Sequence, residues 1–364
     1  MKLIRRRHPS GWHTVMSVFL AMIATTFLSL IVLWLTAEQP LEALWQMLTY
    51  PYQGGTVSVQ WGKAVNTMTY LAVIGLGLSI GFRANVWNIG AEGQFAFGGI
   101  GAFGTWLFIG TPDSQWATPI LLAGGAVCGM GWACIPAFLR TKTNTNELLT
   151  SLMLVYVAGQ TLFFLSNGPW ETNFSYSPPQ TDHLPTNVLF KGFFPITTKL
   201  HWGLIISAFV YALISFILLK TILGFRLAVA ENTPKAESFS GFSPNKTVWI
   251  AFLFSGGLAG LMGAIYLCGD IGYLTEASNF LRGFGFSAIV VAFLGRLHPL
   301  GILFAALFLG YVEGGATWIQ ANLQEDDSIA GFIEVIALMS TLASAVFVNY
   351  RIEWNTYKSG LKTK

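Results

Sequence analysis

The sequence predicts an all-helical protein that crosses a membrane many times. Of its 364 residues, 53% are hydrophobic and only 10% are charged, and the mean hydropathy is +0.57. Soluble domains carry about 25% charged residues, so the composition excludes an ordinary soluble fold. Apolar segments of membrane-spanning length recur along the chain, and its basic residues gather in alternate connecting segments.

Ten segments have about the 20 apolar residues that a helix needs to cross the hydrocarbon core, and we interpret residues 1–364 as one transmembrane domain. The predicted spans are 15–35, 64–82, 89–110, 119–139, 147–165, 203–220, 247–268, 281–295, 299–318 and 330–349. The segment 281–295 is short and rich in glycine, which is typical of a discontinuous membrane helix.

The basic residues predict how the spans are oriented. With a cytoplasmic N-terminus, all but four of the 20 lysines and arginines fall in cytoplasmic segments. Cytoplasmic segments of membrane proteins are enriched in Lys and Arg, so this asymmetry supports ten spans with both termini in the cytoplasm. It places the loop 221–246 inside and the loop 166–202 outside. The four exceptions are Lys63, Lys191, Lys199 and Arg282.

The stretch from Ala84 to Gly99 lies between two apolar segments but contains two Asn, one Glu, one Gln and four Gly. Such polarity is costly at membrane depth unless the groups line a cavity or are buried in protein. One interpretation is a helix start with Asn88 as the N-cap and Glu92 in the first turn. The other is an interrupted segment that faces a polar path through the membrane.

For the second interpretation, candidate lining residues come from this stretch and from the short segment 281–295. Polar side chains and free backbone groups at a helix interruption can accept or donate hydrogen bonds to a polar ligand, and aromatic rings can stack on a planar one. The candidates are Asn85, Asn88, Glu92, Gln94, Phe95, Phe284, Phe286 and Ser287.

Two glycine-rich irregular segments occupy matching positions in the two halves of the chain. Each is the second member of a group of four spans, the second to fifth and the seventh to tenth. An offset of five spans reverses the direction of crossing, so we predict inverted repeats.

Several motifs lose their usual meaning in this context. Gly99, Gly101 and Gly104 match the dinucleotide-binding pattern but follow no strand, so we assign them to close helix packing. The same applies to the pairs Gly125/Gly129 and Gly256/Gly260. The sequence has no phosphate-binding loop, no nucleophile–base arrangement and no metal-ligand spacing. It therefore predicts a protein that is not an enzyme, with no catalytic residue, no metal and no nucleic-acid partner.

Four motifs in order resemble the permease subunits of bacterial ABC importers for simple sugars and nucleosides, with the nucleoside-type branch the most similar. They are Asn88-Ile-Gly-Ala-Glu-Gly-Gln94, Thr145-Asn-Glu-Leu148, Leu223-Gly-Phe-Arg-Leu-Ala-Val-Ala-Glu-Asn232, and Gly285-Phe-Ser-Ala288 together with Leu294-Gly-Arg-Leu-His-Pro-Leu-Gly301. The resemblance covers residues 60 to 350.

The resemblance implies a vitamin-importer-like (type II) ABC permease fold of about ten helices with inverted repeats, in the bacterial cytoplasmic (inner) membrane. It implies three kinds of partner: a second permease that forms a heterodimer, ABC ATPase subunits, and an extracytoplasmic solute-binding protein. ATP and Mg²⁺ would bind to the ATPases, and this chain would hold no cofactor. The expected ligand is a neutral polar solute, favoured to be a nucleoside. Alternatives are a pentose or hexose, or a carrier driven by an ion gradient.

The internal loop 221–246 matches the segment that contacts the ATPase in this family. Leu223, Phe225 and Leu227 alternate with other residues there, and the part from Ala228 onward is the more helical in pattern. The loop departs from the family at Ala230 and Glu237. The predicted coupling residues are Gly224, Val229, Glu231, Asn232, Ala236 and Phe239.

Overall fold

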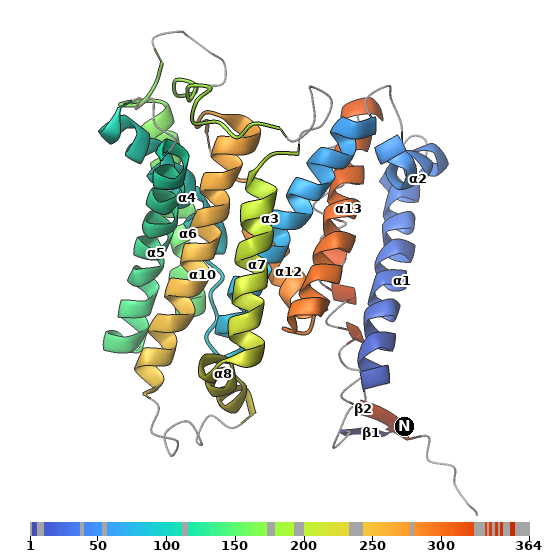
Figure 1. Cartoon of the computed structure of the whole chain (residues 1–364). Helices are drawn as coiled ribbons and strands as arrows, with labels where there is room; N and C mark the ends of the chain where they lie inside the picture. The colour runs from blue at the N-terminus through green and yellow to red at the C-terminus, as the bar shows by residue number, and fades with distance from the viewer. Residues whose placement is uncertain are drawn as a thin grey trace, which may run out of the picture.

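In the computed structural model, most of the described residues form helices that stand side by side (Figure 1). The described residues are 2–5, 11–36, 40–52, 57–110, 116–172, 179–192, 200–232, 243–276, 280–323, 350–353 and a few positions between 332 and 344. Most of the predicted span 330–349 lies outside them.

The described residues include helices in most of the predicted spans, and also two short helices, α2 and α8, in segments predicted as connections. The helices are α1 (Gly11–Thr36), α2 (Pro40–Thr49), α3 (Val57–Arg83), α4 (Ala91–Ile109), α5 (Ala117–Thr143), α6 (Glu147–Ser166), α7 (Gly203–Lys220), α8 (Ile222–Asn232), α10 (Pro244–Tyr266), α12 (Phe284–Leu294) and α13 (Pro299–Leu323), with a 3-10 turn η1 (Tyr50–Tyr52) and a π turn η2 (Leu267–Ile271).

Six helices in the described part of the chain are long and apolar enough to cross a membrane. They cover Trp61–Arg83, Ala117–Thr143, Glu147–Ser166, Gly203–Lys220, Pro244–Ile271 and Pro299–Ile319. The prediction of a polytopic, all-helical membrane protein is therefore confirmed. The total of about ten spans stays a prediction.

The two halves of the bundle run in opposite directions. In Figure 1, α3 and α5 descend, whereas α10 and α13 ascend. In chain order, the shorter helix α4 comes between α3 and α5, and the shorter helix α12 comes between α10 and α13. Both begin near mid-height; α4 ascends and α12 descends. The order α3, α4, α5 thus recurs in reverse direction as α10, α12, α13, which is the inverted arrangement that the sequence predicts.

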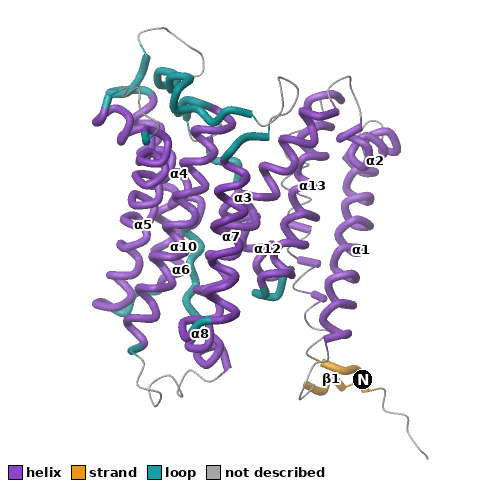
Figure 2. The backbone as a smooth tube through the Cα atoms, in the orientation of Figure 1, coloured by secondary structure: helices purple, strands orange, loops and turns teal. Residues whose placement is uncertain are grey.

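An extended segment, residues 84–90, joins α3 to α4. In Figure 2 it is the teal tube that rises from the level of α8 to the start of α4. Non-helical backbone at this depth is tolerated where it is buried in protein or lines a water-filled cavity. Val86 and Asn88 are both buried, which meets that requirement.

Helices α4, α5 and α10 pack closely because small residues face each other. A Cβ atom on Gly98 of α4 would lie 2.1 Å from the carbonyl oxygen of Gly260 on α10. On α5, a Cβ atom on Gly129 would lie 2.5 Å from the carbonyl oxygen of Gly256. Backbone-to-backbone packing of this kind is how membrane helices associate, and it confirms the packing role predicted for the glycines.

The two ends of the chain meet at the same end of the bundle as α8 (Figure 1). There strand β1 (Lys2–Arg5) pairs antiparallel with β2 (Tyr350–Glu353). At this end too, the side chain of Arg83 donates a 2.8 Å hydrogen bond to the carbonyl oxygen of Leu297, in the turn between α12 and α13. Burial and the positive charge of Arg83 lower the pKa of His298 in this turn.

Close packing makes the small residues of α4 and α10 sensitive to a single added methyl group. We expect Gly98→Ala to lower the free energy of unfolding by about 1–3 kcal/mol, because the Cβ collides with backbone that cannot rotate away. The matched control is Gly131→Ala on α5, where a Cβ meets nothing within 4 Å. Thermal unfolding in detergent should show a lower Tm for Gly98→Ala only; equal Tm values for both variants would contradict the packing role.

Candidate functional site

The carboxylate of Glu92 joins two helices that begin in the middle of the bundle. Glu92 lies in the first turn of α4 and is 2% exposed. It accepts hydrogen bonds from the backbone N–H groups of Gly283, at 2.8 Å, and Gly285, at 2.5 Å, where α12 begins. A helix start has unpaired N–H groups and a partial positive charge, so one carboxylate stabilises the N-termini of both helices.

Glycine is required at the α12 side of this junction. Gly283, the N-cap of α12, has φ +80°, a conformation that side chains disfavour. A Cβ atom on Gly285 would lie 2.2 Å from the backbone nitrogen of Glu92. The two helix starts are therefore in backbone contact, and no larger residue fits between them.

Of the first interpretation, the first-turn position of Glu92 is found, but Asn88 is not the N-cap of α4, because the N-cap is Gly90 and it makes no side-chain cap. Asn88 instead forms a buried cluster with Gln94 and Ser255. Its Nδ2 donates to Gln94 Oε1 at 2.9 Å and to Ser255 Oγ at 2.8 Å. Its Oδ1 accepts from the backbone of Gly90 at 3.0 Å and from Gln94 Nε2 at 3.1 Å. These four bonds use the hydrogen-bonding capacity of the Asn88 amide.

The structure brings most of the predicted path residues together in the core. Six of them are no more than 3% exposed: Asn88, Glu92, Gln94, Phe95, Phe284 and Ser287. Asn85 lies apart, in the exposed turn after α3, and Phe286 is 38% exposed on α12. That these eight residues line a path stays a prediction.

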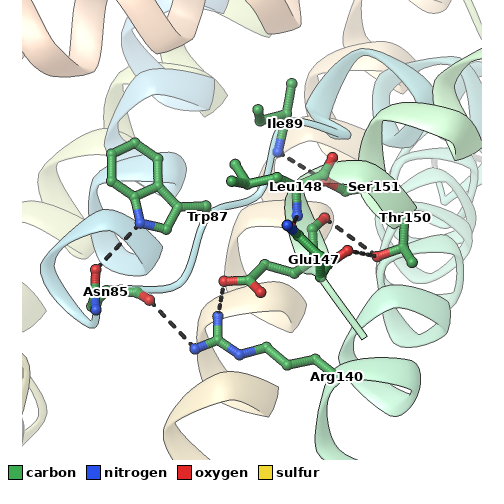
Figure 3. Close-up of polar contacts among 9 residues, drawn as sticks. Asn85, Trp87, Ile89, Arg140, Glu147, Leu148, Thr150 and Ser151 are labelled. Carbon is green, nitrogen blue, oxygen red and sulfur yellow. Dashed lines mark hydrogen bonds and ion pairs between the residues drawn. The ribbon is translucent and has the colours of Figure 1, made fainter. Parts of the chain in front are cut away.

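A second polar cluster holds the other end of the extended segment (Figure 3). Arg140 near the end of α5 forms an ion pair with Glu147 at the start of α6 and donates a 3.4 Å hydrogen bond to the carbonyl oxygen of Asn85. The Asn85 side chain accepts from Trp87 Nε1 at 3.2 Å. Further along, the backbone N–H of Ile89 donates to Ser151 Oγ at 3.2 Å. The segment 84–90 is thus fixed along its length.

A cavity of about 490 Å³ lies between α3, α10 and α13. Ligand pockets commonly have volumes of about 300–1,000 Å³. Four charged residues border it, two of each sign, together with polar and aromatic side chains. The lining comprises Tyr50, Lys63, Ala64, Asn66, Thr67, Tyr70, Tyr266, Asp270, Ile271, Arg282, Phe284, Glu313, Gly314, Thr317 and Trp318.

Asp270 is held in the wall of this cavity by its neighbours. Asn66 Nδ2 donates to Asp270 Oδ1 at 3.1 Å, and the Tyr70 hydroxyl donates to Oδ2. His201 lies behind, with Nε2 3.8 Å from Oδ2. Because the backbone N–H of Gly203 donates to His201 Nδ1 at 3.1 Å, the ring proton sits on Nε2 and points toward Asp270 and Tyr70.

Sequence reasoning missed most of this cavity. Phe284 is the one predicted path residue that borders it. Asp270 escaped notice because the predicted span ended at residue 268, whereas the π turn η2 continues the helix to Ile271. Lys63 and Arg282 were noted only as exceptions to the charge asymmetry. The available signal was charge at membrane depth, because Lys63 directly precedes a predicted span and Arg282 and Glu313 lie within predicted spans.

Comparison with known proteins now decides the family. The family described as "Branched-chain amino acid transport system / permease component" matches residues 62–347, well over half of the chain. The chain belongs to this family. The prediction of a transport subunit is therefore confirmed, and the permease is not itself expected to carry out a chemical reaction.

Three curated relatives of this permease are themselves named as permeases. It is 29% identical over 291 residues to the glucose ABC transporter permease protein TsgB13 of Haloferax volcanii, covering 78% of this chain and 76% of that one. It is 29% identical to the nucleoside ABC transporter permease protein NupB of Lactococcus lactis, with 70% and 71% covered. The guanosine ABC transporter permease protein NupP of Bacillus subtilis is 29% identical, with 70% and 73% covered.

Among solved structures, PsaBC from Streptococcus pneumoniae in complex with Fab matches the permease with a TM-score of 0.45 and 11% identity, covering 82% of this chain and 94% of that one. The family assignment rests on the sequence matches.

The predicted coupling segment begins with helix α8 at one end of the permease (Figure 1). The helix starts at Ile222, earlier than the pattern suggests. Gly224 permits this, since its Cβ position is 1.9 Å from the carbonyl oxygen of Leu218 in α7. Val229, Glu231 and Asn232 belong to α8, whereas Ala236 and Phe239 lie outside the described residues. Ile222 and Phe225 are 76% and 67% exposed.

The junction at Glu92 should be sensitive to loss of one carboxylate oxygen. In Glu92→Gln the new amide NH₂ would face a backbone N–H, leaving a buried donor without an acceptor. We expect the free energy of unfolding to fall by about 1–3 kcal/mol. The control is Glu171→Gln, which changes the same charge at an exposed position. Thermal unfolding of the purified permease measures the difference, and a wild-type Tm for Glu92→Gln would refute the role of the carboxylate at the junction.

Proposed function

We propose that this chain is a permease subunit of an ATP-driven importer and forms half of the path for a nucleoside. The observation that carries the proposal is the cavity between α3, α10 and α13, which combines aromatic rings with hydrogen-bonding groups. Two of the three relatives described above carry nucleosides or guanosine in their names, which supports this ligand class.

The charges around the cavity favour a neutral ligand. Lys63 and Arg282 are matched in number by Asp270 and Glu313. A site for a phosphorylated ligand would need an excess of basic groups, because phosphate carries negative charge and pairs with Arg and Lys. Asp270 in particular would repel a phosphate group. A nucleoside meets the requirement, with polar hydroxyls at one end and an aromatic base at the other.

A neutral sugar is the second candidate, and one observation favours it. The relative named for glucose is as similar to this chain as those named for nucleosides. A pentose or hexose offers the same hydroxyl groups but no aromatic base. A carrier driven by an ion gradient is disfavoured, because these relatives are all named as ABC transporter permeases.

The assembly would include a second permease in a heterodimer, ABC ATPases that bind ATP and Mg²⁺, and an extracytoplasmic binding protein. We place the complex in the inner membrane with both termini in the cytoplasm. The pairing of β1 with β2 supports termini on one side, and the distribution of Lys and Arg supports the cytoplasmic side.

Uptake in the native bacterium tests the ligand class. A strain without this gene, with and without a plasmid copy, is assayed for uptake of radiolabelled guanosine and of radiolabelled glucose and ribose. We expect guanosine uptake to depend on the plasmid copy and to be competed by excess unlabelled nucleosides but not by the sugars. Sugar uptake that depends on the plasmid while guanosine uptake does not would establish the sugar alternative.

Energy coupling would occur through α8 and the residues that follow it, because the sequence has no nucleotide-binding loop of its own. Exposed apolar side chains on a short helix suit docking into a groove of an ATPase. Leu227 of α8 is buried at 2% exposure, so the helix is anchored while Ile222 and Phe225 remain available. Val229, Glu231, Asn232, Ala236 and Phe239 would extend this contact.

We expect Phe225→Asp to release the ATPase, because a charge in an apolar groove is desolvated without a partner. Phe225→Leu is the control that keeps an apolar side chain. Co-purification of the ATPase and ligand-stimulated ATP hydrolysis in proteoliposomes should be lost in the first variant and kept in the second. Should both variants retain the ATPase and its activity, α8 is not the docking element.

A further inference from the structure

We infer that the cavity between α3, α10 and α13 is a binding site for the sugar moiety of the ligand, in which Asp270 accepts hydrogen bonds from its hydroxyl groups. The inference rests on the proposed function for the identity of the ligand.

Asp270 has acceptor capacity directed into the cavity. An ionised carboxylate offers about four lone-pair sites, and the bonds from Asn66 and Tyr70 occupy one on each oxygen. The side chain is 18% exposed and borders the cavity. Its neighbours hold it in one orientation, so a ligand hydroxyl would meet an acceptor that is already in place. Carboxylates serve in this way for ribose hydroxyls in dinucleotide-binding folds.

Tyr50 supplies an independent sign of a ligand. This residue is 1% exposed and borders the cavity, yet its hydroxyl has no hydrogen-bond partner among the described residues. Buried hydroxyls are nearly always bonded, so this one is suited to a hydrogen bond with a ligand in the cavity. Gly314 on α13 leaves space for the Tyr50 hydroxyl, because a Cβ atom on Gly314 would lie 2.4 Å from the hydroxyl oxygen.

Three aromatic rings close the cavity toward the centre of the bundle. Ring centroids are 5.8 Å apart for Tyr70 and Tyr266, and 5.6 Å apart for Phe284 with each of them. Phe284 lies between Gly283 and Gly285, whose N–H groups bind Glu92. The floor of the site is therefore fixed to the junction of the two discontinuous helices, which is where a transport site is expected in an inverted-repeat permease.

The test compares nucleosides that differ in their sugar hydroxyls. Initial uptake rates are measured for guanosine, 2′-deoxyguanosine and 2′,3′-dideoxyguanosine with the intact complex, and normalised to the amount of assembled permease. Asp270→Asn should raise the KM for guanosine about tenfold and reduce the preference for guanosine over the deoxy compounds. Tyr50→Phe removes only the unbonded hydroxyl, leaves packing intact, and should raise the KM about fivefold.

Each variant has a matched control. Asp182→Asn makes the same change at an exposed position of the external segment, and Tyr156→Phe does so on a side chain that is 68% exposed. Both controls should retain the wild-type KM and the wild-type preference.

The outcomes separate this inference from the proposed function. Wild-type guanosine uptake with unchanged KM and unchanged preference in both Asp270→Asn and Tyr50→Phe would overturn the site while leaving the nucleoside function intact. If the wild type carries glucose instead, the proposed ligand fails, and the same variants are compared with glucose and its deoxy analogues. A raised KM then upholds the sugar-binding site, and an unchanged one overturns it. A wild type that carries neither class overturns both.

Discussion

The carboxylate of Glu92 is the interaction on which the centre of this permease depends. Two helices begin at mid-depth and run in opposite directions, and each would present unpaired N–H groups to an apolar interior. A single carboxylate bonds the N–H groups of Gly283 and Gly285 while lying in the first turn of its own helix. The charge is stabilised by two partial positive charges, and the start of α12 gains an acceptor for its N–H groups.

The inverted repeats meet at this point. Helix α4 packs against α5 and α10, and α12 packs against α3 and α13. The contact between α4 and α12 near Glu92 and Gly285 therefore joins two groups of helices that are otherwise related by reversal of direction. This contact also explains how Glu92, a charged residue, can be 2% exposed in a membrane-spanning bundle, because backbone N–H groups of α12 bond its carboxylate.

Composition, helix pattern and charge asymmetry were enough to predict a polytopic helical protein with inverted repeats. They could not position side chains that meet across the two halves. Asn88 was considered as an N-cap because Asn often caps helices, but it pairs instead with Gln94 and with Ser255, which is 167 residues away. Asp270 was missed because a π turn cannot be read from apolar periodicity. Gly285 was recognised as part of a motif, whereas its contact with the Glu92 backbone depends on the fold.

The segment 84–90 has a mechanical consequence for any rearrangement of the transport path. Polar contacts hold it at Asn85, at Ile89 and at Asn88, on partners from α5, α6 and α10. An extended segment that is held by polar contacts along its length cannot become longer. The start of α4 therefore cannot shift along the membrane normal by itself. Displacement of α4 would have to carry α5, α6 and α10 with it as one rigid body. Since Gly283 and Gly285 bond the start of α12 to Glu92 of α4, such a displacement would also draw on the start of α12.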